Sequence, residues 1–187
     1  MRYVVGIDPG LSGAIAFLDI TKATLFCADM PLKRFGYRSE IDREALGRLF
    51  DREDIMHAGL EAAFIIPGTA RQRAADEAKG RSRGGSIGQG LKIGQNWGLL
   101  DGVLAAHFIP TTVVRALEWK RAINCPTEKS KAIEYATTLM PACKSWWPRQ
   151  KDDGRAEAAM IAWYIAEEIG IELDDVQPVQ ELVRHDD

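Results

Sequence analysis

The chain has 187 residues, of which 46% are hydrophobic and 27% charged, and its formal net charge is -3. This length suits one packed core better than two, and the composition is far from that of a disordered chain. No run approaches the roughly 18 apolar residues of a membrane span, and the three cysteines (Cys27, Cys125, Cys143) offer neither a CxxC pair nor an even set for disulfides. We therefore expect a folded, single-domain protein of the cytoplasm.

Apolar runs and turn residues predict an α/β chain. Residues 3–7, 13–20 and 23–30 are separated by short breaks rich in turn formers, which predicts a meander of three strands. Residues 41–53 have apolar side chains at helical spacing, and residues 57–65 form a short apolar run typical of a buried strand. The remaining elements that we expect are a helix at 91–108, a strand at 109–114, a helix at 127–140 starting at Thr127, and a helix at 153–170 ending at Gly170.

The negative charge is concentrated at the C-terminal end. Residues 167–187 hold eight acids against one base, a local charge of -7, so residues 1–166 carry the difference, +4. A net positive charge over most of the chain is compatible with binding to phosphates. We expect one folded domain over residues 1–171, followed by an acidic tail over residues 172–187.

Two basic segments are candidate phosphate-binding surfaces. Residues 71–83 and 115–131 each hold five bases against two acids, and the first lies within a glycine-rich stretch from Pro67 to Gly90 that we expect to be a functional loop. Solvated loops and helix faces would show the same pattern. The basic residues that we expect to contact the phosphates of a bound partner are Arg71, Arg73, Lys79, Arg81, Arg83, Lys120, Lys129 and Lys131.

Three glycines lie four residues apart in the helix expected at 91–108. Gly94, Gly98 and Gly102 share one helix face, and a face without side chains lets another backbone approach closely. We expect this face to pack on the sheet.

Two acids follow or interrupt apolar strands. Asp8 comes directly after the first strand and before Pro9-Gly10, where a carboxylate can project into a cleft, although Asp-Pro-Gly also forms turns in its own right. Glu61 interrupts a run that we expect to be buried, and an unpaired buried carboxylate costs several kcal/mol. None of its nearest neighbours in sequence is basic, so Glu61 needs a cation from elsewhere.

A third acidic position lies at the start of the final helix. Asp153 and Glu157 are four residues apart and so lie on one helix face, where like charges repel unless they are solvated or share a positive partner. Together with Asp8 and Glu61 they make four carboxylates, which are the hard oxygen ligands that Mg²⁺ or Mn²⁺ prefers. Two such ions can hydrolyse a phosphodiester without a serine, histidine or cysteine nucleophile. His57 lies on the same strand face as Glu61, but we expect it to be structural.

The segments GIDPGLSGAIAFLD, LEAA and DDGRAEAAMIAWY resemble, in order and spacing, the RuvC-type Holliday-junction resolvases, especially those of bacteriophages and prophages. The resemblance covers nearly the whole chain. It implies a ribonuclease H-like α/β fold, with a mixed five-stranded sheet, helices on both faces, and the first and fourth strands as neighbours. Asp8 and Glu61 would then converge.

The resemblance also implies site residues. Asp8, Glu61 and Glu157 match the acids of the first strand, the fourth strand and the last helix. Related proteins often space the last two acids by three, which falls here on Gly154; we take Asp153 as the fourth ligand, with Asp152 as the alternative. Lys120, Lys129 and Lys131 lie where similar proteins keep phosphate-binding bases.

The implied activity is Mg²⁺-dependent cleavage of four-way DNA junctions by a homodimer in a bacterial cytoplasm. The loop from Pro67 to Gly90 is our candidate for gripping the branch point, with Phe64 as an alternative wedge. The same acids would serve a nuclease of flaps, forks or RNA-DNA hybrids, and a junction-binding protein without catalysis is a further alternative. The first strand lacks the Asp-x-Glu of proofreading exonucleases, and actin-like ATPases need about twice this length.

Overall fold

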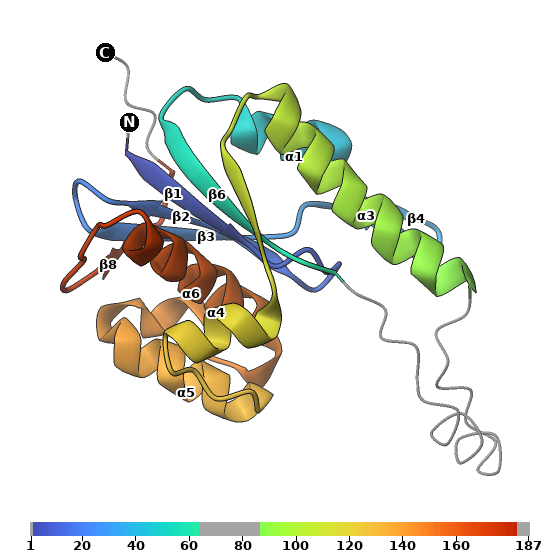
Figure 1. Cartoon of the computed structure of the whole chain (residues 1–187). Helices are drawn as coiled ribbons and strands as arrows, with labels where there is room; N and C mark the ends of the chain where they lie inside the picture. The colour runs from blue at the N-terminus through green and yellow to red at the C-terminus, as the bar shows by residue number, and fades with distance from the viewer. Residues whose placement is uncertain (1, 64–86, 183–187) are drawn as a thin grey trace, which may run out of the picture.

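The computed structural model describes residues 2–63 and 87–182, and the expected α/β fold is confirmed (Figure 1). One six-stranded sheet has the order β7-β6-β1-β2-β3-β8. Its strands are β1 (Tyr3–Ile7), β2 (Ala14–Asp19), β3 (Thr24–Asp29), β6 (Ile55–Glu61), β7 (Thr111–Val114) and β8 (Gln177–Pro178). The first three form an antiparallel meander, and β6 runs parallel to both β1 and β7. The sixth strand, β8, adds a short parallel pairing to β3 beyond the five strands expected.

Helices cover both faces of the sheet, as predicted. On one side lie α4 (Ala116–Ala122), α5 (Lys129–Leu139) and α6 (Asp153–Glu168), and on the other lie α1 (Arg43–Phe50) and α3 (Ile87–Ala106) (Figure 1). Strand alternation divides the core between them: Val4 faces the α6 side, whereas Val5 faces the α1 side. Since both faces are covered, β1 and β2 are buried along their whole length.

The helix α6 lies unusually close to the central strands. A Cβ added at Gly6 of β1 would lie 2.0 Å from the carbonyl oxygen of Ala158, so only glycine fits there. The helix presents small side chains such as Ala158 and Ala162 to the sheet, and both are fully buried. This close contact places the first turn of α6 at the end of β1 that leads into Asp8.

The structure contains elements that the sequence patterns did not predict. Strands β4 (Leu32–Phe35) and β5 (Arg38–Ile41) form a separate two-stranded sheet, and α4 follows β7. Two short 3₁₀ turns, η1 (Pro141–Trp146) and η2 (Gln150–Asp152), precede α6.

Several expected element ends are shifted. The expected helix at 41–53 is shorter because Asp42 caps α1, its side chain accepting hydrogen bonds from the backbone of Glu44 and Ala45. The N-cap of α5 is Glu128 rather than Thr127. The helix α3 begins at Ile87, so the last residues of the stretch expected to be a loop up to Gly90 are helical.

The expectation for the three glycines of α3 is wrong. A Cβ at Gly94, Gly98 or Gly102 would meet no atom of residues 2–63 or 87–182 within 4 Å, so this face does not pack on the sheet. The helix instead buries Leu100 and Leu104 against the sheet. Within the part of the chain that the structure describes, nothing covers the glycine face, which we call the open face of α3.

The described residues include all three cysteines and every helix that can be compared with a membrane span. Cys27, Cys125 and Cys143 are buried free thiols. Over residues 2–63 and 87–182, no helix has both the length and the hydrophobicity to cross a bilayer.

Candidate active site

Asp8 lies in a tight turn at the C-terminal end of β1. Its backbone N–H donates to the carbonyl oxygen of Ala14 at 3.0 Å, which joins the turn to β2, and its Oδ1 accepts a long hydrogen bond of 3.4 Å from the N–H of Gly10. The pairing of β1 with β2 closes the turn, and this holds the Asp8 carboxylate at the C-terminal end of β1.

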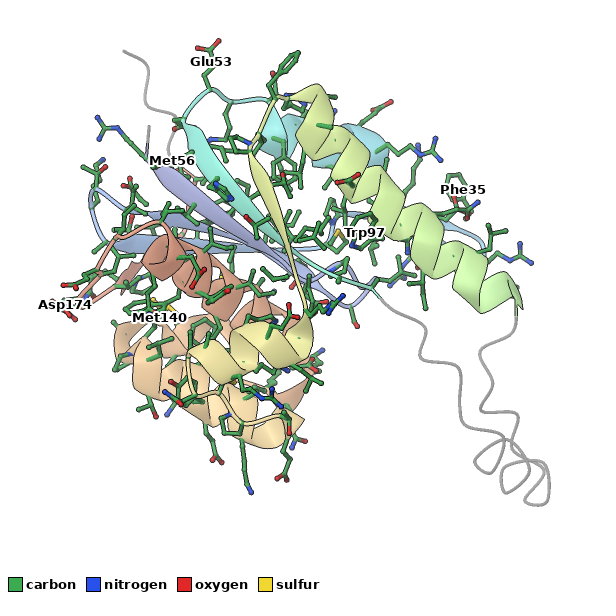
Figure 2. All side chains as sticks on the ribbon, viewed as in Figure 1. Phe35, Glu53, Met56, Trp97, Met140 and Asp174 are labelled. Atoms are coloured by element: carbon green, nitrogen blue, oxygen red, sulfur yellow. The ribbon has the colours of Figure 1, made fainter. Side chains whose placement is uncertain are left out.

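Glu61 ends β6 beside Asp8. The parallel register pairs Ile7 with Leu60, so the next residues, Asp8 and Glu61, leave adjacent strands at the same level. Two tryptophans that the sequence analysis did not single out hold Glu61. Trp119 Nε1 donates to Oε1 of Glu61 at 3.2 Å, and Trp97 Nε1 donates to its backbone oxygen at 3.0 Å. Figure 2 labels Trp97 on α3.

Glu157 enters the same site from α6, paired with Lys120 of α4. The Lys120 ammonium lies 2.6 Å from Oε1 of Glu157, and the two side chains are only 10% and 12% exposed. Lys120, which we expected to bind phosphate, therefore lies within the acid cluster. Its position next to Trp119 in the segment EWK, directly after a strand, is the signal in the sequence that could have placed both residues here.

The acids affect one another's charge. Burial raises the pKa of Glu61 to about 7, and repulsion from Glu157 and Asp8 adds to this, against the opposing effects of the Trp119 hydrogen bond and the Lys120 charge. We expected Glu61 to need a nearby cation. Lys120 offsets the charge of Glu61 only in part, because its ammonium is paired directly with Glu157. The cluster carries more negative than positive charge.

The first turn of α6 packs on the Asp8 turn. A Cβ at Gly154 would lie 2.7 Å from the carbonyl oxygen of Ser12 and 3.1 Å from Oδ2 of Asp8. A side chain at residue 154 would not fit. This is the position at which the three-residue spacing of related proteins would place an acid. Asp153, the neighbouring residue, is half-buried on the same helix turn.

Asp152 has a different environment. Its two oxygens accept hydrogen bonds from the Arg149 guanidinium at 2.7 and 2.9 Å, and its Oδ2 also accepts one from the Arg149 backbone N–H at 3.1 Å. These bonds hold the pKa of Asp152 below its usual value. Asp152 thus fastens the turn that precedes α6.

The other predicted residues are dispersed. Lys131 is exposed and pairs with Glu128 at 3.0 Å, and His57 shares a 2.8 Å hydrogen bond with Thr112, as a structural role requires. The remaining candidates lie outside the described residues, as does the side chain of Lys129; they are Phe64, Arg71, Arg73, Lys79, Arg81 and Arg83.

The donor set suits a hard divalent cation in its chemistry. Carboxylate oxygens are the ligands that Mg²⁺ and Mn²⁺ prefer, and a cation would neutralise the excess negative charge beside Glu61. Within the part of the chain that the structure describes, no three His, Cys, Asp or Glu side chains already form a compact ligand group. Glu157 would have to share its oxygens between Lys120 and such an ion.

Comparison with known proteins identifies the fold. RuvC of T. thermophilus in complex with a Holliday junction substrate matches with a TM-score of 0.54 and 11% identity, over 91% of this chain and 98% of that one. A structure of Thermus thermophilus RuvC matches with a TM-score of 0.50 and 12% identity, over 90% of this chain and 97% of that one. No protein-family model matches the sequence, and neither does any curated protein. The chain therefore has the ribonuclease H-like fold of RuvC.

Proposed function

We propose that this protein is a metal-dependent nuclease that resolves four-way DNA junctions, of the kind found in bacteriophages and prophages, acting in a bacterial cytoplasm. The observation that carries the proposal is the meeting of Asp8, Glu61 and Glu157 at one edge of the sheet, where their mutual repulsion contributes to the raised pKa of Glu61. The similarity in fold to a RuvC that was solved with a Holliday junction substrate supports the choice of substrate.

The residues of the site have separate tasks. Asp8, Glu61 and Glu157 would hold Mg²⁺, with Asp153 as the fourth ligand. Two bound ions would supply an activated water and stabilise the leaving oxygen of the phosphodiester. Trp119 orients the Glu61 carboxylate through Oε1, and the Lys120 ammonium does the same for Glu157. Asp8 is positioned by the turn itself, so each carboxylate is held before substrate arrives.

Two observations support Asp153 over Asp152 as the fourth ligand. Both oxygens of Asp152 are bonded to Arg149, whereas Asp153 lies on α6 four residues before Glu157. Gly154 has no room for an acid. The lack of room at residue 154 supports a spacing of four, from Asp153 to Glu157, in place of the spacing of three.

Cleavage of matched synthetic substrates tests the proposed activity. We expect symmetric paired nicks, with 5′-phosphate ends, in a four-way junction incubated with Mg²⁺. Equal cutting of a flap, a fork or an RNA-DNA hybrid would replace junction resolution with one of those activities. Binding with Ca²⁺ but no cleavage with Mg²⁺ or Mn²⁺ would indicate a junction-binding protein instead.

Asp8→Asn tests the site itself. We expect cleavage to be abolished, because a metal ligand is lost, while junction binding is kept or tightened, because a negative charge facing the phosphates is removed. Gel assays of cleavage and of binding on the same junction check this. Glu172→Asn, an exposed acid remote from the cluster in sequence, is the matched control and should cleave normally. Cleavage by Asp8→Asn at the wild-type rate would end the proposal.

We further propose that the protein works as a homodimer through the open face of α3. Two opposed strands of a junction need two active sites. The exposed glycines Gly94, Gly98 and Gly102, with the exposed Leu91 on the same side of the helix, would let a second copy of α3 approach closely.

A further inference from the structure

The β4–β5 hairpin stands apart from the main sheet. Leu32 pairs with Ile41 and Phe35 with Arg38, which leaves Gly36 and Tyr37 as a two-residue turn. Gly36 has a φ of 59°, the left-handed value that the first position of such tight hairpin turns often requires. The hairpin is therefore a regular, well-formed projection.

The hairpin exposes its aromatic side chains. Tyr37 at the tip is fully exposed, Phe35 is 56% exposed, and the whole of β4 lies at the surface. An isolated two-stranded hairpin is only marginally stable in water, and of its strand residues only Ile41 is buried. Exposed aromatic groups on such an element do not contribute to the core, and exposed apolar groups gathered together indicate a binding surface.

Basic side chains surround the exposed ring of Phe35. The Lys33 ammonium lies 5.7 Å from the centroid of this ring, and Arg38 is the cross-strand partner of Phe35 on the same face. Including Arg34, the hairpin has three basic residues and one acidic residue, Glu40. The net positive charge of the hairpin is therefore complementary to phosphate, and its aromatic rings can stack on nucleobases.

The base of the hairpin is tied to the Asp8 turn. The N–H of Met30 donates to the carbonyl oxygen of Gly13 at 3.0 Å, and the N–H of Asp42 donates to Pro31 at 2.8 Å, which closes the base. Just before it, Asp29 accepts two hydrogen bonds of 2.6 Å from Arg155 of α6. The hairpin thus leaves the sheet at the edge that carries the acids. Figure 2 shows Phe35 at the margin of the molecule.

We propose that the β4–β5 hairpin binds unpaired nucleotides of the branched DNA, with nucleobases stacked on Tyr37 and Phe35 and phosphates contacted by Lys33 and Arg38. This inference rests on the proposed function for its substrate class. Proteins commonly bind single-stranded nucleic acid on a surface that combines aromatic side chains, on which nucleobases stack, with basic side chains that contact the phosphates. The hairpin then selects junctions whose bases have opened at the branch point, close to the site of cleavage.

Metal-free binding in the Asp8→Asn background separates the hairpin from catalysis. The probes are fluorescent oligo(dT), a duplex, and a four-way junction with 2-aminopurine at the branch point. We expect Tyr37→Ala to weaken oligo(dT) binding about tenfold and to reduce the 2-aminopurine signal change, with little effect on the duplex. Tyr37→Phe keeps the ring and should bind within about twofold of the parent. Arg38→Ala should weaken oligo(dT) binding and lower the slope of its salt dependence by about 0.7.

Phe108→Ala is the matched control, because Phe108 is 92% exposed and lies between α3 and β7, away from the hairpin in sequence. It should bind like the parent. Unchanged oligo(dT) binding by Tyr37→Ala and Phe35→Ala, or an equal loss from Phe108→Ala, would overturn the inference. A fall in the mass of the assembly in Tyr37→Ala would also overturn it, since the hairpin would then be a protein contact.

The outcomes also distinguish the inference from the proposed function. Tyr37-dependent binding in a protein that cleaves no junction would support the hairpin's role while removing the nuclease. Junction cleavage by wild type, with binding indifferent to Tyr37 and Phe35, would do the reverse.

Discussion

Gly154 joins the fold to the chemistry at a single residue. Its missing side chain lets the first turn of α6 rest on the Asp8 turn, with the carbonyl oxygen of Ser12 and Oδ2 of Asp8 in the space that a Cβ would need. A change here therefore alters packing and the position of a carboxylate together.

We expect Gly154→Ala to lower the free energy of unfolding by about 1–3 kcal/mol, the usual cost of overpacking a rigid contact, and to reduce cleavage as Asp8 is displaced. Urea unfolding and a cleavage assay measure the two effects. The control is Gly47→Ala in α1, where a Cβ meets nothing within 4 Å; it should be neutral or stabilising by up to about 1 kcal/mol. Equal stability of the two variants would contradict the close contact.

Glu61 makes stability depend on pH. Its pKa is about 7 in the folded protein against an ordinary value of 4.5, so between these values the folded state binds more protons than the unfolded state. Without metal, the free energy of unfolding should therefore fall as pH rises from 4.5 through 7, by up to about 3 kcal/mol. Denaturant unfolding at a series of pH values measures this, and Glu61→Gln should flatten the profile while the exposed Glu172→Gln should not.

Mg²⁺ should offset this loss above pH 7, because an ion that binds only the folded state stabilises it. The midpoint of thermal unfolding should rise with Mg²⁺ in wild type and not in Asp8→Asn. A rise of equal size in both proteins would mean that the ion binds elsewhere.

At the scale of elements, α4 completes the site that β1, β6 and α6 begin. Trp119 and Lys120 are consecutive residues of this seven-residue helix, and they contact Glu61 and Glu157 respectively. Lys120 and Glu157 are nearly excluded from water, so each depends on the other for its charge to be tolerated.

Lys120→Met should destabilise the metal-free protein by about 3–5 kcal/mol, because Glu157 is left buried beside Glu61 without its cation. Lys120→Met with Glu157→Met removes both charges and should recover most of that loss. Thermal or urea unfolding with EDTA measures both proteins. If the double variant is no more stable than the single one, the pair does not act as a unit.

The elements that could be predicted from sequence are those with a strong local pattern. The strands at 3–7, 13–20 and 23–30 are apolar runs between turn formers. The final helix, expected to end at Gly170, ends at Glu168, two residues before that glycine, whose φ is 81°. The hairpin β4–β5 was missed because a polar, exposed strand pair has no buried face and hence no hydrophobic alternation. The open glycine face of α3 was misjudged because glycine spacing alone does not say which surface it meets.

The site was predictable in part, because two of its acids end strands that have a strong local pattern. Asp8 and Glu61 could be expected to meet, since each ends a strand and the resemblance makes those strands neighbours. The hydrogen bonds of Trp119 and Trp97 to Glu61 join residues 58 and 36 positions apart. Such contacts depend on how α3 and α4 pack and leave no periodic trace in the sequence.

At the scale of the whole molecule, the proposed homodimer would arrange its two active sites through the face of α3 that carries Gly94, Gly98 and Gly102. Gly98→Arg places a long, charged side chain at the centre of the glycine face, and we expect it to turn a dimer into a monomer that nicks junction strands singly. Light scattering after gel filtration gives the mass, and plasmid cruciform cleavage distinguishes paired from single nicks. Gly47→Arg, at an open glycine of α1, is the control and should stay dimeric. A wild-type protein that is monomeric on the junction would refute the arrangement.

The packing of α6 on β1 has a consequence for synthesis of the protein. Glu157 follows Asp8 by about 150 residues, so at 5–20 residues per second a ribosome needs roughly 8 to 30 s between them. During that time the face of the sheet that α6 will cover lacks this helix, and apolar surface exposed in this way is prone to aggregation. On the proposed mechanism, a growing chain would lack Glu157 and could not cut DNA until α6 had left the ribosome.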